Sequence, residues 1–225
     1  MYYDLHIHSC LSPCADDDMT PNNIVNMAIL NGLEMIAVTD HNSLLQQKVI
    51  HDLCLKKGIR YIYGVEVQSK EDVHILCYFK EYRQIIYFQE YIDRYLSKID
   101  NRPNYFGNQY LRDINDDIVD DYSHLLLMSL DQSIDDIINY AKDINGIVVL
   151  AHIDGRENAI INNLGFIPEN LRYDGLEIPR KEDIELYRLK YPKCHLFLHN
   201  SDAHRLVDIQ ERIIEFDREV QKIFI

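Results

Sequence analysis

Apolar and polar positions along this chain alternate between a strand-like and a helix-like pattern. Residues 3–9 form a short apolar segment whose side chains would point alternately to two faces, and residues 35–39 form another. Apolar residues recur at helical spacing over 21–32, behind a Thr20 N-cap, and over 43–58, which ends in glycine. This β-α order repeats and predicts parallel βα units.

The middle of the chain interrupts this alternation. Residues 60–67 and 73–79 are rich in β-branched and aromatic side chains and predict two strands separated by a charged turn. Residues 82–99 carry apolar side chains on one helical face and predict an amphipathic helix. The stretch 101–123 contains a proline, a glycine and five aspartates. We interpret about 80–135 as an inserted segment whose central part is a solvated loop or hairpin.

The last part of the chain returns to the β-α pattern. Ser133 begins a sequence resembling a capping box, S-I-D-D, that predicts a helix, and an apolar strand follows at 147–151. Further strands are expected at 174–178 and 195–200, with a helix at 182–190 between them. So many βα units favour a closed or nearly closed barrel.

Composition and charge restrict the class of protein. The length of 225 residues favours one domain. A net charge of −14 leaves no broad basic surface for gripping a duplex, so a protein that reads duplex DNA is not expected. The five scattered cysteines fit a reducing compartment, and the sequence shows neither a secretory leader nor a membrane-spanning apolar run. We expect a cytoplasmic protein with no membrane partner; the sequence does not indicate its oligomeric state.

Polar side chains suited to metal binding lie at the ends of the predicted strands. His6 and His8 are two residues apart in the first strand, so both imidazoles leave the same face and form a chelating pair. Similar donors at other strand ends are His41, Glu66, His74, His152, Asp202 and His204. Because the C-terminal ends of parallel strands share one face, these residues can converge. The mixture suits zinc, manganese or iron and exceeds what one four-coordinate ion can use.

Five short segments, taken in order, resemble the motifs of the PHP (polymerase and histidinol phosphatase) domain family. They are H-I-H-S at 6–9, T-D-H-N at 39–42, G-V-E-V at 64–67, A-H-I at 151–153 and S-D-A-H at 201–204. Together they extend over nearly the whole chain. The resemblance implies a distorted (β/α)7 TIM-like barrel, here a single PHP domain over 1–225. It also implies two or three divalent metal ions, Zn, Mn or Fe, at the C-terminal ends of the strands.

The resemblance assigns roles to individual residues. The metal ligands would be His6, His8, Asp16, His41, Glu66, His74, His152, Asp202 and His204, which is the full set of a trinuclear metal centre. The catalytic residues among them would be His6, His8, Glu66, Asp202 and His204. One ligand is ambiguous, because the segment reads C-A-D-D-D-M-T-P. Counting back from Thr20-Pro21 favours Asp16 over Asp17 or Asp18.

Residues near these motifs receive other interpretations. Cys10 and Cys14 lie close to the first histidine pair and could form a thiolate zinc site. Because the histidine and carboxylate set is already full, we assign both a packing or loop role. Asp40 is expected to orient a ligand histidine rather than to bind metal. The candidates for binding substrate phosphate are Arg156, then Arg180 and Arg205, since arginine suits bidentate phosphate contact.

The reaction class that the resemblance implies is hydrolysis of a phosphate ester by a metal-bridging hydroxide. Two ions roughly 3.5–4 Å apart can activate such a hydroxide and hold the attacking and leaving oxygens. The expected substrate is a small nucleotide or the end of a short single-stranded oligonucleotide, and a histidinol-phosphate-type phosphatase is an alternative. Two further alternatives are an amidohydrolase-type hydrolase and a non-catalytic metal-binding interaction module.

Overall fold

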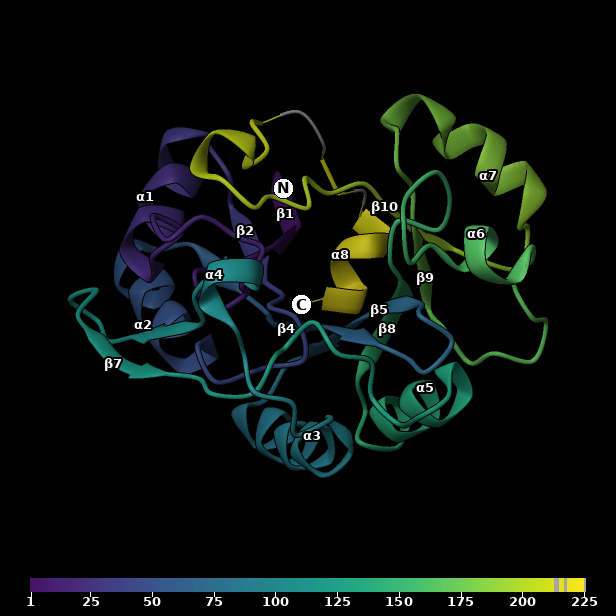
Figure 1. The fold of residues 1–225 in the computed structure, drawn as a ribbon. Coiled ribbons are helices and arrows are strands. Elements are labelled where there is room, and N and C mark those ends of the chain that lie inside the picture. The colour runs from purple at the N-terminus through teal and green to yellow at the C-terminus, as the bar shows by residue number, and fades with distance from the viewer. Residues whose placement is uncertain (213–214, 217, 225) are drawn as a thin grey trace.

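The computed structural model describes residues 1–212, 215–216 and 218–224 (Figure 1). The strands are β1 (Tyr3–Ile7), β2 (Met35–Val38), β3 (Arg60–Tyr61), β4 (Tyr63–Gln68), β5 (His74–Phe79), β6 (Tyr110–Arg112), β7 (Ile118–Asp121), β8 (Ile147–Leu150), β9 (Gly175–Glu177) and β10 (Leu196–Leu198). The α-helices are α1 (Pro21–Leu30), α2 (Gln47–Lys57), α3 (Tyr82–Tyr95), α4 (Pro103–Phe106), α5 (Ile134–Asp143), α6 (Ile160–Leu164), α7 (Ile184–Lys190) and α8 (Arg218–Phe224). Strands and helices therefore alternate through much of the chain, as the apolar pattern predicts.

Two sheets carry the fold. One has the strand order β1-β2-β3 and the other the order β10-β9-β8-β5-β4, while β6 and β7 form a separate hairpin. Isolated parallel bridges join the two sheets at two places, between Ile7 and Ala203 and between His41 and Glu66. The chain therefore has a mixed α/β fold with parallel sheets, and the closed barrel of seven units stays a prediction.

Apolar side chains pack on both faces of these strands. In β5, Leu76 and Tyr78 face an interior cluster shared by both sheets, whereas Ile75 and Cys77 belong to a cluster with α3 and α5. The helices α1 and α2 cover the three-stranded sheet on its other side (Figure 1). No helix in the described part of the chain is long and apolar enough to cross a membrane.

One strand runs against the expected direction. The alternating pattern predicts parallel units throughout, but β5 pairs antiparallel with both β4 and β8. Only residues 69–73 separate β4 from β5, and a parallel pair needs a much longer crossover. The reversed direction places His74, at the start of β5, opposite Gln68 at the end of β4. A residue at the start of this strand therefore reaches the edge at which β4 ends.

Helices begin at the predicted residues where a capping side chain precedes them. Thr20 caps α1, and Ser133 caps α5 in a capping box. The expected start of the second helix at Ser43 is wrong, because α2 begins at Gln47. The side-chain amide of Asn42 donates to main-chain carbonyls of the insertion at 2.7 and 3.0 Å, which ties the preceding residues to the insertion instead. The short helix α6 was not expected.

The insertion between β5 and α5 folds onto the loop that follows β1. It contains α4 and the β6–β7 hairpin, whose second strand is fully exposed, in agreement with the expected solvated hairpin. The main-chain N–H of Tyr110 donates to the carbonyl of Cys10 at 3.0 Å. Gly107 lies so close to Pro13 that an added Cβ would be 1.9 Å from the Pro13 carbonyl oxygen. The insertion is therefore packed beside the first histidine pair.

We predict that Gly107→Ala separates the insertion from this loop and lowers the free energy of unfolding more than Gly165→Ala. Both glycines have positive φ, 101° and 79°, so alanine strains either backbone by about 1–3 kcal/mol. Only Gly107 has a neighbour in the way, which adds about 1–3 kcal/mol of overpacking. Chemical denaturation of the two variants measures the difference. Equal losses of stability would show that the contact with Pro13 does not hold the insertion.

Candidate metal centre

The carboxylate of Glu66 lies at the centre of a buried cluster of histidines. Glu66 is on β4 and is 1% exposed. Its Oε1 lies 2.9 Å from His74 Nδ1, 3.2 Å from His152 Nε2 and 3.3 Å from His6 Nε2, and its Oε2 lies 3.1 Å from His41 Nδ1 and 3.4 Å from His8 Nε2. A buried charge is tolerated only where partners compensate it, and these rings surround both oxygens.

Asp202 closes the cluster on the side of the first histidine pair. Its Oδ1 is 3.3 Å from Nε2 of His6 and 3.3 Å from Nε2 of His8. Asp202 has a φ of 53° and His152 a φ of 22°, both in the left-handed region that residues other than glycine rarely adopt. Backbone strain of this kind clusters at functional sites.

The bridges between the two sheets hold the ligand candidates in place. His6 in β1 and His8 directly after this strand direct their rings to the same side, as predicted, since their Nε2 atoms lie 3.2 Å apart. His41, just after β2, forms an isolated bridge with Glu66. Ala203, in the middle of the D-A-H motif, forms another bridge with Ile7 of β1. Residues far apart in the sequence are thereby fixed to the same edge.

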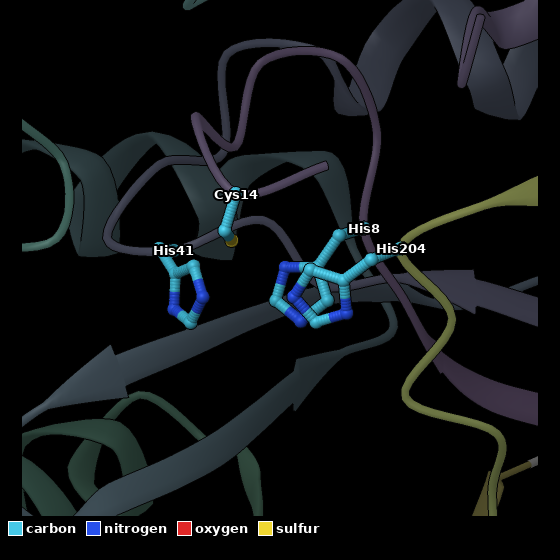
Figure 2. Close-up of side chains that lie close together, drawn as sticks. All are labelled: His8, Cys14, His41 and His204. Atoms are coloured by element: carbon cyan, nitrogen blue, oxygen red, sulfur yellow. The ribbon is translucent and has the colours of Figure 1, made fainter. Parts of the chain in front are cut away.

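Three groups of donor atoms have the spacing of a metal site. They are His6, His8 and Asp202; His41, Glu66 and His74; and His8, Cys14, His41 and His204. The donor atoms of each group lie within 4.8 Å of one another. Figure 2 shows the third group, in which the sulfur of Cys14 turns towards the space between the ring of His41 and the stacked rings of His8 and His204. The predicted ligands other than Asp16 thus converge, and a cysteine joins them.

The donor set fits divalent cations. Nδ1 of His6 faces Glu177 at 3.0 Å and Nδ1 of His8 faces the hydroxyl of Ser12 at 3.1 Å. With protons on those nitrogens, the two Nε2 atoms present lone pairs to each other across 3.2 Å. Such a pair needs a proton or a cation between its members, and the adjacent carboxylates stabilise either one. Imidazole with carboxylate is a donor set that zinc, manganese and iron accept.

The electrostatics keep both carboxylates of the cluster ionised. Burial by itself raises the pKa of Glu66, but His74 and His6 outweigh burial and hold this pKa well below its ordinary value. Burial also opposes ionisation of Asp202, yet His6 and His8 lower its pKa. The cluster therefore presents negative oxygens, which are the form that binds metal.

The histidines divide into two kinds. Burial and the neighbouring His204 lower the pKa of His8 to about 4, and burial and His8 hold the pKa of His41 well below its usual range. Both are neutral imidazoles near pH 7, as metal ligands must be. His6 differs: burial lowers its pKa, but Glu177 and the carboxylates of the cluster outweigh this and raise it well above the ordinary value.

Glu177, at the end of β9, supports the cluster from behind. It is 3% exposed and accepts from Nδ1 of His6 at 3.0 and 3.1 Å, from the main-chain N–H of His152 at 2.8 Å and from the amide of Asn200 at 2.7 Å. These contacts turn Nε2 of His6 towards Glu66. Glu177 is not among the residues expected from the sequence, although an acidic side chain near the end of the apolar segment D-G-L-E-I is a usable signal.

Asp40 occupies the supporting position that the sequence suggested. It is buried and accepts from the main-chain N–H of Ser9 at 2.7 Å and from the hydroxyl of Ser12 at 2.7 Å. The same hydroxyl lies 3.1 Å from Nδ1 of His8. Asp40 therefore acts on the cluster through Ser12, which orients His8.

The loop after β1 carries the ambiguous ligand candidate. Asp16 is exposed, like the two aspartates that follow it, and among the described residues it belongs to none of the three donor groups. Its main-chain N–H instead donates to the carbonyl of His204 at 2.9 Å. Cys10 is buried beside the insertion, as predicted. The expected packing or loop role is wrong for Cys14, because its sulfur lies among the donor atoms of three histidines.

The three candidate arginines have different surroundings. Arg156 forms an ion pair with Asp202, so the structure brings it to the edge of the cluster. The other two are exposed and paired with an aspartate three positions further along, Arg180 with Asp183 and Arg205 with Asp208. Of the three, Arg156 is the one that pairs with a residue of the cluster in the described part of the chain.

We predict that Glu177→Gln weakens metal binding by about 10–100-fold, the usual effect of removing a partner of a ligand histidine. The amide keeps the size of the side chain but no longer holds His6 with two equivalent oxygens. Titration calorimetry with Zn²⁺ or Mn²⁺ measures the affinity. Glu185→Gln, which changes an exposed glutamate on α7, is the matched control. An unchanged affinity in Glu177→Gln would contradict the supporting role.

Comparisons with solved structures give the same fold. Endonuclease Q from Pyrococcus furiosus, a lesion-specific endonuclease, has a TM-score of 0.67 and 21% identity, over 91% of this chain and 48% of that one. A proposed metal-dependent phosphoesterase from Bifidobacterium adolescentis has a TM-score of 0.60 and 18% identity, over 91% and 88%. An amidohydrolase from Chromobacterium violaceum, with bound sulfate and no metal, has a TM-score of 0.65 and 17% identity, over 99% and 97%. This chain thus spans about half the length of endonuclease Q.

Sequence comparison identifies the family. A search of curated proteins gave no match. Residues 4–178 match the PHP domain, which is more than half of the chain and includes the first histidine pair, His41, Glu66 and His152. The matched motifs are those whose side chains meet around Glu66. The chain belongs to the PHP domain family.

Proposed function

We propose that this chain is a metal-dependent phosphoesterase that hydrolyses a phosphate ester of a small nucleotide or at the end of a short oligonucleotide. The observation that carries the proposal is the buried Glu66, whose two oxygens face different histidines. Two ions that share such a carboxylate can hold the attacking and leaving oxygens of a phosphate ester. Membership of the PHP family and the likeness to a proposed metal-dependent phosphoesterase support a metal-dependent hydrolase.

The residues of the cluster would divide between neighbouring ions. One ion would be held by His6, His8 and Asp202 and its neighbour by His74 and His152, with Glu66 shared between them. When bound, such ions would supply positive charge for the phosphate and lower the pKa of a water molecule. Glu177 would keep His6 oriented, and Arg156 would contact the phosphate. We propose zinc, manganese or iron as the native metal.

The chain outside the cluster would shape the substrate site. We propose a single PHP domain over 1–225 with a TIM-like barrel, in which the insertion at about 80–135 forms the rim of the site. Gly107 touches Pro13, next to the cluster, and Tyr105, two positions before Gly107, is 84% exposed. Its ring is available to stack on a nucleobase at this rim. The net charge of −14 disfavours long nucleic acids, whose binding depends on many phosphate contacts.

We predict metal-dependent release of inorganic phosphate from a nucleoside 3′,5′-bisphosphate. Manganese-loaded protein is compared with metal-stripped protein, and Glu66→Gln is expected to lose at least about 100-fold in activity, since loss of a shared ligand exceeds loss of its supporting partner. Glu90→Gln, an exposed glutamate on α3, is the matched control. Activity of Glu66→Gln near that of the wild type would contradict the site.

The same manganese-loaded and metal-stripped protein separates the alternative substrates when the products of each substrate are followed by chromatography. Short single-stranded oligonucleotides and histidinol phosphate test the other phosphate esters, and a cyclic amide tests an amidohydrolase. A solved complex of endonuclease Q holds a 27-mer duplex with an abasic lesion at the active site, so such a duplex is included. Turnover of the amide alone would show that the chain is an amidohydrolase rather than a phosphoesterase. No turnover of any substrate would favour a non-catalytic metal-binding module.

We predict that Arg156→Ala raises the KM for the phosphate ester about 10–100-fold with the metal content unchanged, which corresponds to one lost hydrogen bond to a charged group. The affected contact is with substrate rather than with metal. Steady-state kinetics and metal analysis measure both quantities, and Arg172→Ala, an exposed arginine paired with Asp143, is the control. A KM that changes only in Arg180→Ala or Arg205→Ala would move the phosphate contact to those residues.

A further inference from the structure

The third donor group differs chemically from the other two because it contains sulfur. The nitrogen and sulfur donors of His8, Cys14, His41 and His204 lie within 4.8 Å of one another. The ring centroids of His8 and His204 are 4.3 Å apart and those of His8 and His41 are 4.5 Å apart. Figure 2 shows the sulfur of Cys14 directed into the space that these rings border. Four donors from three parts of the chain therefore face a common point.

The loop that carries Cys14 is held on both sides of this residue. Ser12, two positions before it, donates to Asp40 at 2.7 Å, and the main-chain N–H of Asp16, two positions after it, donates to His204 at 2.9 Å. Pro13 is covered by Gly107 of the insertion. The position of the thiol is thus set by contacts on its neighbours, and one of those contacts is with a residue of the same donor group.

Cys14 is distinct from the other cysteines. Cys10, Cys54, Cys77 and Cys194 are buried, and none of them belongs to a donor group among the described residues. Cys14 is exposed as a residue. Cysteine sulfur and histidine nitrogen are both common zinc ligands and occur together in zinc sites, whereas an exposed cysteine on a loop needs no histidine neighbours.

We propose that Cys14 is a thiolate ligand of a metal ion at the outer edge of the centre, bound together with His41 and His204. His8 already directs its Nε2 to Glu66 and Asp202, so it belongs to the inner part of the centre. Three protein donors leave a fourth position open, as in catalytic zinc sites. This inference rests on the metal centre of the proposed function but not on the identity of the substrate.

The sulfur donor determines which metal ion the outer position binds. Thiolate with imidazole favours zinc, iron or cobalt over manganese and magnesium, which prefer oxygen donors. The inner positions around Glu66 and Asp202 are richer in oxygen and accept manganese as well. The centre would therefore hold one sulfur-bound ion that resists exchange for manganese, next to ions that exchange more readily.

Cobalt substitution tests the ligand directly. Metal-stripped protein titrated with Co²⁺ is expected to develop a near-ultraviolet charge-transfer band from thiolate to cobalt, and Cys14→Ser is expected to lose it. Asp16→Asn and Cys194→Ser are the matched controls, and both are expected to keep the band. Zinc analysis is expected to show the loss of one equivalent in Cys14→Ala and none in Asp16→Asn. A band that survives in Cys14→Ser, or zinc lost only from Asp16→Asn, would overturn the proposal.

A second measurement needs no variant. Alkylation of Cys14 by iodoacetamide, followed by peptide mapping, is expected to proceed in metal-stripped protein at a pH that ionises the thiol, and to be suppressed by Zn²⁺ at the same pH. Equal rates with and without Zn²⁺ would also overturn the thiolate ligand. Neither measurement uses phosphate ester hydrolysis: protein that is active but lacks the cobalt band refutes only this inference, and protein with the band but no activity refutes only the proposed phosphoesterase.

Discussion

A carboxylate that stays ionised although it is fully enclosed is the constraint on which this structure depends. Burial of an unpaired carboxylate costs several kcal/mol, and the attraction of Glu66 to the nearby His74 and His6 offsets that cost. The rings come from four places in the chain, so the charge holds together segments that have no sequence neighbours in common. Metal cations bound between the histidine rings and the carboxylates would further neutralise the buried negative charge.

The direction of the strands determines whether these rings can meet. Parallel strands bring their C-terminal ends to one edge, which accounts for His41 and His152. His74 is at the start of a strand and reaches the same edge only because β5 is antiparallel. The bridge between Ile7 and Ala203 then attaches the D-A-H motif to β1. The antiparallel hairpin is thus part of the site and not an irregularity beside it.

A second layer of buried acids keeps the donors oriented. Glu177 holds His6, and Asp40 holds His8 through Ser12. Asp4 accepts from the main-chain N–H of Ser201 at 3.1 Å and so ties β1 to the residue before Asp202; burial raises the pKa of Asp4 to about 6. Each of these carboxylates is buried where hydrogen bonds compensate it, so geometry and stability are supplied by the same contacts.

The sequence by itself determined the features that are written locally. Period-two spacing placed His6 and His8 on one face, Thr20 and Ser133 capped the predicted helices, and ordered motifs identified the family and most of the ligand candidates. Each of these features depends on residues a few positions apart, within one strand or one turn of a helix.

Only the tertiary structure decided the features that depend on distant contacts. The segment C-A-D-D-D at 14–18 offers several possible donors. The contacts of Ser12 with Asp40 and of Asp16 with His204 direct the sulfur of Cys14 towards the histidines and leave the side chain of Asp16 exposed. Glu177 gained its role from the packing of β9 beside β8, which places it against His6 and His152. Spacing along the chain cannot choose among such donors, because the choice depends on which side chains the rest of the fold brings within hydrogen-bonding distance.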